Sequence, residues 1–235
     1  MYSNLPDCDD WQFISEISNR FPSRDIMKRF REFVDMVPSR RPKMAAIRTN
    51  FVDREGWYDV GISPPVQSLR DHIDTMLDML HHLSPADIDI PHLAAIIEIH
   101  DLQEAITSDF TWDDPISKAE KHRIEQMAIN IIYENQPGKI TLWNEYAAKR
   151  TTGALWVNDI DKLECIYEFE VVRSKTPGLQ ETFNHWSNDV RAVLKTDRGL
   201  QICNYLAATA DAGIKLGDKH ARIAETGRFL HITPT

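Results

Sequence analysis

The chain has 235 residues, of which 42% are hydrophobic and 27% are charged, and this composition is typical of a folded globular protein. Its 36 acidic and 27 basic residues give a formal net charge of −9, so it lacks the broad basic surface of proteins that bind duplex nucleic acid, and we expect no such partner. No apolar run approaches the roughly 18 residues that cross a bilayer, and the acidic first residues carry no signal-peptide segment, so we expect no membrane partner.

Apolar residues recur with helical periodicity along almost the whole chain, and the few glycines and prolines fall between the periodic stretches. The clearest helix start is Ser117, which forms a capping-box pattern with Glu120. Residues 50–67 are expected to form a loop, and the polar residues from about 217 on are expected to fray. The sequence predicts an all-α fold with roughly seven to nine helices in a single domain over residues 1–235. The expected helices span about residues 24–37, 68–83, 91–106, 117–136, 140–150, 154–175 and 179–195, with a last helical region around 200–210.

An adjacent histidine and aspartate, His100 and Asp101, stand near the end of the helix expected over residues 91–106. The isoleucines before them predict that this helix is buried, and a buried carboxylate is costly unless it is paired or binds a metal. A neutral imidazole beside a carboxylate offers two ligands that suit a divalent cation. Because such a pair also occurs by chance, it is weak evidence by itself.

Two further residues extend this pattern. His72 shares a helix face with two methionines, so we expect it to point into the core, either as a metal ligand or as a hydrogen-bonded core histidine. Asp161 borders the apolar face of its helix and is either a ligand or the partner of Lys162 or Lys215 in a salt bridge. Asp159 is expected to point outward.

The order of His72, the His100-Asp101 pair and Asp161 resembles that of the HD-domain phosphohydrolases, and most closely that of the HD-type 5′-deoxynucleotidases. An isolated His-Asp pair is weak evidence, whereas an ordered set of motifs over about residues 45–172 is specific. The supporting motifs are Arg54-Glu-Gly-Trp57, Ser68-Leu-Arg-Asp71-His72, His100-Asp101-Leu-Gln-Glu104-Ala105 followed by Asp109, Lys118-Ala-Glu-Lys-His-Arg123-Ile-Glu125, Leu142-Trp143-Asn-Glu145-Tyr146 and Asp159-Ile-Asp161-Lys162.

The resemblance implies a helical HD core over about residues 45–175, with additional N-terminal helices and a C-terminal helical extension over about residues 178–235. In this family the first histidine, the His-Asp pair and the late aspartate bind one divalent metal ion. Mixed imidazole and carboxylate ligation accepts Mn, Co, Fe, Zn or Mg, and such an ion lowers the pKa of bound water and polarises a phosphoryl group. The residues that match these ligands are His72, His100, Asp101 and Asp161.

The resemblance also implies roles for four further residues. Glu104, one helical turn after His100, is implied as a proton-transfer or substrate residue, and Asp109 as the residue that orients water or protonates the leaving 5′-oxygen. Arg54 is implied as a phosphate ligand and Trp57 as a contact of the sugar or base. The alternatives are a solvated carboxylate for Glu104, a turn residue for Asp109 and simple packing for Trp57.

Some features depart from the family pattern. Ser108 stands where the family often has glycine before Asp109, and the loop of residues 110–115 carries a tryptophan and two acids where the family is usually smaller. Lys121 and Arg123, just after the capping box, either contribute positive charge near the cleft or form part of a solvated face, and we favour the second interpretation. These departures leave the metal ligands intact and the identity of the substrate open.

These observations predict a metal-dependent phosphohydrolase that acts on a nucleoside 5′-monophosphate, preferentially a deoxynucleoside, and releases inorganic phosphate. One alternative is hydrolysis of a deoxynucleoside triphosphate at the same metal centre, for which the motifs lack a dense basic cluster. The others are a catalytically inactive regulatory HD domain and a helical interaction module. Three widely spaced cysteines without a CxxC pair predict a cytoplasmic location, and a homodimer fits a helical domain of this kind.

Overall fold

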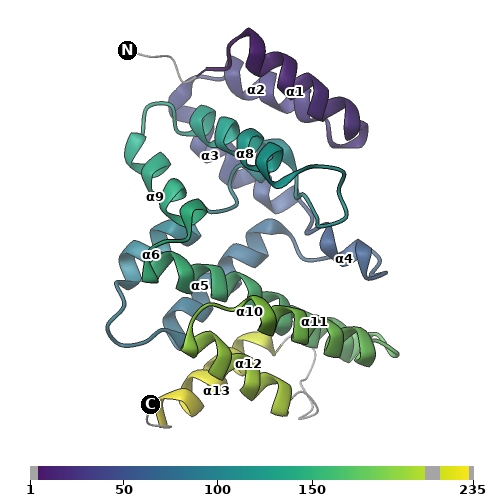
Figure 1. Cartoon of the computed structure of the whole chain (residues 1–235), viewed down its shortest axis with the longest axis vertical. Coiled ribbons are helices and arrows are strands. Elements are labelled where there is room, and N and C mark those ends of the chain that lie inside the picture. The colour runs from purple at the N-terminus through teal and green to yellow at the C-terminus, as the bar shows by residue number, and fades with distance from the viewer. Residues whose placement is uncertain (1–4, 210–217, 233–235) are drawn as a thin grey trace. The chain divides into compact units, whose positions relative to one another are not determined.

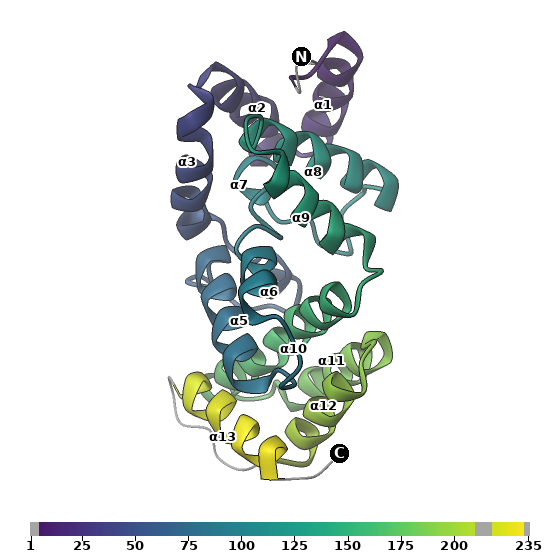
Figure 2. The same ribbon diagram turned by 90° about the vertical axis from the view of Figure 1, so that its left-hand side faces the viewer.

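The computed structural model describes residues 5–209 and 218–232 (Figures 1 and 2). Within these ranges the regular structure consists of α-helices α1 to α13 and three short 3₁₀ helices, with no strand beyond an isolated bridge between Asp53 and Ser68. The prediction of an all-α fold is therefore confirmed. None of the described helices is long and apolar enough to cross a membrane.

The contacts divide the chain into two compact units. Unit 1 comprises residues 1–71 and 98–144, and unit 2 comprises residues 72–97 and 145–235. The single domain over residues 1–235 stays a prediction.

Unit 1 buries the apolar face of α2, which packs against α1, α7 and α8 (Figure 2). Ile26, Phe30 and Phe33 of α2 are fully buried, and their spacing of four and three residues places them on one helix face. The start of α8 matches its prediction, since Ser117 and Glu120 form the expected capping box. The helices of unit 1 are α1 (Cys8–Arg20), α2 (Ile26–Asp35), α3 (Arg41–Arg48), α4 (Gly56–Asp59), α7 (Glu104–Thr107) and α8 (Lys118–Ile132).

Unit 2 is organised around α10, which packs against α6, α11, α12 and α13. Thr151 caps α10 by accepting a hydrogen bond from Ala154 N at 3.0 Å. The helix buries Trp156 and Phe169, and it therefore forms the core of this unit. The helices that lie wholly in unit 2 are α6 (Ile90–Ile97), α10 (Thr152–Lys175), α11 (Gln180–Val193), α12 (Asp197–Thr209) and α13 (Lys219–Ile232), while α5 (Leu69–Leu83) and α9 (Pro137–Ala148) run across the boundary in sequence.

The frayed C-terminal tail is a wrong prediction for residues 218–232. Residues 219–232 form α13, which buries Ile223 and Leu230 and packs on α10 and α12 within unit 2. The rest of that tail lies outside the described residues. A short apolar stripe between charged residues forms a helix here because packing, and not propensity, stabilises it.

Asp159 also differs from its prediction, because it is fully buried and does not point outward. Its Oδ1 accepts a hydrogen bond from Lys195 N at 2.9 Å, and its Oδ2 accepts from Thr196 N at 2.8 Å and from Thr196 Oγ1 at 2.7 Å. The carboxylate thus satisfies backbone donors at the turn between α11 and α12. Its role in this turn is structural.

Candidate functional site

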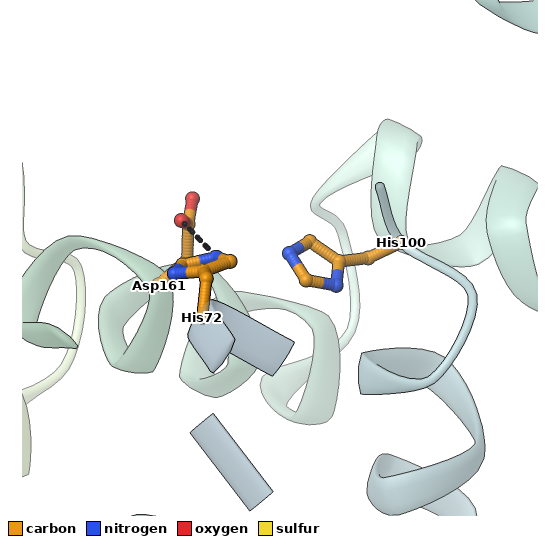
Figure 3. A group of neighbouring side chains, drawn as sticks. All are labelled: His72, His100 and Asp161. Atoms are coloured by element: carbon orange, nitrogen blue, oxygen red, sulfur yellow. Dashed lines mark ion pairs between the residues drawn. The ribbon is translucent and has the colours of Figure 1, made fainter. Parts of the chain in front are cut away.

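His72, on α5, is fully buried beside two carboxylates of α10. Its Nδ1 is 2.8 Å from Glu164 Oε2, and its Nε2 is 3.4 Å from Asp161 Oδ1, the ion pair drawn as a dashed line in Figure 3. Asp161 and Glu164 are three residues apart on α10 and so share one helix face. An ionised Glu164 carboxylate can only accept a hydrogen bond, so we assign the N–H to His72 Nδ1 and the lone pair to Nε2, which lies on the side of Asp161.

Glu164 is a site residue that the sequence prediction missed. Its signal in the sequence is a carboxylate one helical turn after Asp161, within the buried part of α10. Buried carboxylates need a partner, and a histidine that binds a metal commonly donates its second N–H to one. Glu164 therefore orients the His72 ring.

Asp161 itself is 8% exposed at its side chain. Its Oδ2 accepts a hydrogen bond from Tyr146 Oη at 3.3 Å and lies 2.9 Å from Lys162 Nζ. The salt bridge with Lys162 that the alternative interpretation predicted is thus present, whereas Lys215 lies outside the described residues. Asp161 combines this bridge with a position beside His72.

The His100-Asp101 pair lies in a turn, so the prediction of one continuous helix over residues 91–106 is wrong. Helix α6 ends at Ile97 and α7 begins at Glu104, and residues 98–103 between them form turns. Within this segment Leu102 N donates to Ile99 O at 3.2 Å, three residues back, in place of the four-residue pattern of an α-helix.

The turn is stabilised by a tertiary hydrogen bond. The His100 carbonyl accepts from the indole Nε1 of Trp143 at 3.1 Å, which takes this carbonyl out of any helical ladder. The His100 ring is buried, with Nε2 3.0 Å from Asp101 Oδ2. The Trp143 contact thus gives a structural reason for a tryptophan in the Leu142-Trp143 motif.

Arg54 lies beside the second residue of the pair. Its Nη1 is 3.3 Å from Asp101 Oδ2, and its side chain is 16% exposed. A planar guanidinium that is largely removed from water favours bidentate contact with a phosphate or carboxylate. Trp57, on the short helix α4, is only 3% exposed, which favours its packing alternative, and its contact with a sugar or base stays a prediction.

Glu104, the first residue of α7, is 3% exposed, and its Oε2 has no hydrogen-bond partner among the described residues. Burial raises the pKa of Glu104 well above its ordinary value, and the nearby charges of Asp101 and Asp109 raise it further. The solvated carboxylate that the alternative predicted is therefore wrong, because this side chain is enclosed. A carboxyl group in such a position can carry a proton near neutral pH.

Lys121 and Glu125 complete the charged cluster of unit 1. Lys121 Nζ is 3.6 Å from Glu125 Oε1 and donates a hydrogen bond to Phe110 O at 3.0 Å. Burial raises the pKa of Glu125 to about 7, with Asp101 adding to this rise and Lys121 opposing it. The interpretation of Lys121 as part of a solvated face is therefore wrong. The same interpretation holds for Arg123, which is 50% exposed.

Asp109 is tied to the segment that carries Arg54. Its Oδ2 accepts a hydrogen bond from the backbone N–H of Glu55 at 3.0 Å. In unit 1 the structure therefore brings together His100, Asp101 and Arg54, with Asp109 on the adjoining loop. In unit 2 it brings together His72 and Asp161.

Comparison with known proteins identifies the family. Residues 47–196 match the sequence model of the HD domain. The chain belongs to the HD-domain family. The 5′-deoxynucleotidase HDDC2 of Dictyostelium discoideum is 35% identical over 133 residues, which cover 50% of this chain and 70% of that protein. The resemblance to the HD-type 5′-deoxynucleotidases is confirmed.

Other relatives cover similar parts of the chain. The 5′-deoxynucleotidase hdd1 of Schizosaccharomyces pombe is 32% identical over 52% of this chain and 68% of its own length. The human HDDC2 is 28% identical over 57% of this chain and 69% of its own length. A solved structure of a conserved hypothetical protein from Pyrococcus furiosus aligns with a TM-score of 0.54 and 24% identity, over 73% of this chain and 96% of that one. This last likeness concerns the fold alone.

Proposed function

We propose that this protein is a divalent-metal-dependent phosphohydrolase that acts on nucleoside 5′-monophosphates, with a preference for deoxynucleosides. Curated relatives that are 28% to 35% identical are named 5′-deoxynucleotidases. The observation that carries the proposal is the set of buried imidazoles with adjoining carboxylates, His72 with Asp161 and His100 with Asp101, combined with the buried acid Glu104.

The proposed metal ligands are His72, His100, Asp101 and Asp161. His72 and Asp161 are the ligands that unit 2 would supply, and His100 and Asp101 are those that unit 1 would supply (Figure 3). Two imidazoles with carboxylates suit a first-row divalent ion or Mg, and the oriented His72 ring fits this role because Glu164 takes its second N–H. When bound, such an ion supplies an acidified water and a Lewis acid for the phosphoryl group.

The remaining roles belong to side chains of unit 1. Arg54 binds the phosphate, and Asp101 holds its guanidinium in place. In the reaction a water oxygen bonds to phosphorus while the bond from phosphorus to the 5′-oxygen breaks, and the leaving oxygen takes up a proton. Glu104 and Asp109 are the candidates for moving the two protons involved.

The test is release of phosphate from a panel of ribo- and deoxynucleoside mono- and triphosphates. Metal-stripped protein is resupplied with Mn, Co, Fe, Zn or Mg in turn. We expect inorganic phosphate from monophosphates, whereas tripolyphosphate from triphosphates would support the alternative reaction. No release from any member of the panel by metal-loaded protein would support the inactive regulatory domain and overturn the proposal.

A variant pair tests the role of Glu104. Glu104→Gln is expected to keep the bound metal and to lose turnover by about 100-fold, because it removes the ionisable group without changing its size. Glu98→Gln, at an exposed glutamate six residues earlier, is the control and is expected to keep turnover. Equal turnover in both variants would remove Glu104 from the mechanism.

We also propose that the protein is cytoplasmic and that it forms a homodimer. Cys8, Cys165 and Cys203 are not in disulfides, as expected for a reducing compartment. The homodimer and the lack of duplex nucleic acid binding remain predictions, for which light scattering and a DNA-binding titration are the measurements.

A further inference from the structure

The loop between α7 and α8, residues 108–117, begins with an unusual backbone conformation. Ser108 has φ 62° and ψ 169°, in the left-handed half of φ space that glycine occupies readily and other residues do not. Ser108 is also buried, at 6% exposed. A non-glycine residue keeps such a conformation only where its surroundings hold it, and Asp109 follows directly.

Arg29, on α2, supplies one such contact. Its Nη1 donates a hydrogen bond to Ser108 Oγ at 2.7 Å. The serine therefore gains a partner that a glycine at this position would lack, and this contact offsets part of the backbone strain. Arg29 is half-buried, so its guanidinium cannot simply turn into solvent.

Arg24 holds the distal end of the same loop. Its two terminal nitrogens lie 2.9 Å and 3.1 Å from the Asp114 carboxylate oxygens, in a bidentate pair whose side chains are each 13% exposed. The guanidinium also lies 4.8 Å from the ring centroid of Phe21 and 5.1 Å from that of Phe110. Phe110 is the residue after Asp109.

Arg20, near the end of α1, makes a third contact with the loop. Its Nη1 donates to Pro115 O at 3.0 Å, and its Nη2 lies 2.7 Å from Glu120 in the first turn of α8. All three arginines precede residue 47, where the match to the HD domain begins. The contacts are therefore made by residues that precede the matched HD domain.

We propose that Arg20, Arg24 and Arg29 are positioning residues that hold the loop of residues 108–115 and thereby orient the Asp109 carboxylate for phosphoester hydrolysis. This inference rests on the proposed function. The Asp109 carboxylate also accepts a hydrogen bond from Glu55 N at 3.0 Å, and a shift of the loop would displace the carboxylate from this contact.

The test uses Arg29→Met, with Arg31→Met as the matched control. Arg31 is exposed on the same helix and has no part in the loop contacts. We expect Arg29→Met to lower kcat by about tenfold or more, with a much smaller change in KM, because it displaces a reacting group and leaves the phosphate contact in place. Arg31→Met is expected to keep both constants, and Arg29→Lys is expected to restore part of kcat.

A double-mutant cycle separates positioning from general loss of stability. If Arg29 acts by stabilising the backbone conformation of Ser108, then a glycine at position 108 no longer requires the Arg29 contact. Arg29→Met is then expected to lower kcat much less in the Ser108→Gly background than in the unmodified chain. Hydrogen exchange of the peptide covering residues 108–116 is expected to speed up in Arg29→Met and Arg24→Met and to stay unchanged in Arg31→Met.

Any of three results would overturn the inference. The first is an unchanged kcat in Arg29→Met, the second is an equal loss of kcat from Arg29→Met in the unmodified chain and in Ser108→Gly, and the third is an unaltered rate of hydrogen exchange in the loop. They differ from failure of the proposed function, in which the unmodified protein itself hydrolyses no nucleotide.

Discussion

Asp159 and Asp161, two residues apart on α10, are expected to respond in opposite ways to the same substitution. Asp159 receives hydrogen bonds from the turn before α12, whereas Asp161 lies beside His72 and is a proposed metal ligand. Exchange of each aspartate for asparagine keeps the size of the side chain and removes its charge. The pair therefore separates a structural carboxylate from a metal-binding one.

The magnitude for Asp159→Asn follows from its hydrogen bonds. With the amide oxygen in place of Oδ2, the side chain still accepts from Thr196 N and Oγ1, which lie 2.8 Å and 2.7 Å away. The amide nitrogen then lies 2.9 Å from Lys195 N, so two donors meet, and Lys195 N keeps only its longer contact of 3.1 Å with the remaining oxygen. Loss of a hydrogen bond to a charged acceptor, with two donors brought together in a buried place, costs about 3 kcal/mol. For a chain of this length the melting temperature falls by roughly 6–12 °C.

Asp161→Asn is expected to behave differently. Its Oδ2 contacts the Tyr146 hydroxyl and the exposed Lys162 ammonium, and its Oδ1 lies 3.4 Å from His72 Nε2, so no backbone donor loses its acceptor among these contacts. We therefore expect the apoprotein to lose less stability than Asp159→Asn does. The neutral amide is a poor substitute for a carboxylate at a divalent ion, so the variant is expected to lose most of its metal.

The assay combines calorimetric melting of the metal-stripped proteins with metal content after loading and desalting. An Asp159→Asn protein that melts within about 2 °C of the unmodified chain would refute the hydrogen-bond reasoning. An Asp161→Asn protein with full metal content would refute its assignment as a ligand.

Two further predictions concern unit 2. Gly227→Ala places a Cβ 2.4 Å from His82 O and is expected to lower the free energy of unfolding in urea by about 2 kcal/mol. Gly138→Ala, whose Cβ meets no atom within 4 Å, is the control and is expected to keep or raise stability. Equal urea midpoints for the two variants would contradict this packing. Burial raises the pKa of Glu170 from 4.5 to about 7, with Arg222 opposing the rise, so the folded state binds the proton more tightly than the unfolded state. The stability of the unmodified chain therefore falls as the pH rises from about 4.5 to 7, by up to about 3 kcal/mol from this group, and Glu170→Gln is expected to remove that part of the slope in urea unfolding at pH 5 and pH 8. Parallel pH dependence in the two proteins would show that Glu170 does not titrate in this way.

The long helices were predictable from sequence because their apolar spacing is regular. The core helix α10 and the capped helix α8 lie close to their expected ranges. Helix α1 was not predicted, although Asp7 and Asp10 form a capping box at its start, because both positions carry aspartate and the pattern sought a serine or threonine followed by glutamate. Local sequence signals are enough to predict a helix that carries both a recognisable cap and a regular apolar stripe.

The chemistry around the His-Asp pair was harder to predict, since tertiary contacts determine it. Nothing in residues 91–106 signals that the helix stops at Ile97. The turn that follows is stabilised by Trp143, which lies 43 residues after His100 and donates a hydrogen bond to its carbonyl. Glu164 was missed for a similar reason. Its role depends on α5, which brings His72 Nδ1 to within 2.8 Å of its carboxylate, and the sequence does not show this contact.

The charges of unit 1 give a separate argument for a bound cation. The cluster holds four carboxyl groups, Asp101, Glu104, Asp109 and Glu125, and the cations of Arg54 and Lys121. Burial raises the pKa of Glu104 well above its ordinary value and that of Glu125 to about 7, so both carboxyl groups bind a proton more tightly than an exposed glutamate does. A phosphate monoester carries nearly two negative charges at neutral pH, and this acidic chain has a net charge of −9. Arg54 alone, already shared with Asp101, does not neutralise such a substrate, so its binding requires a further positive charge at this place.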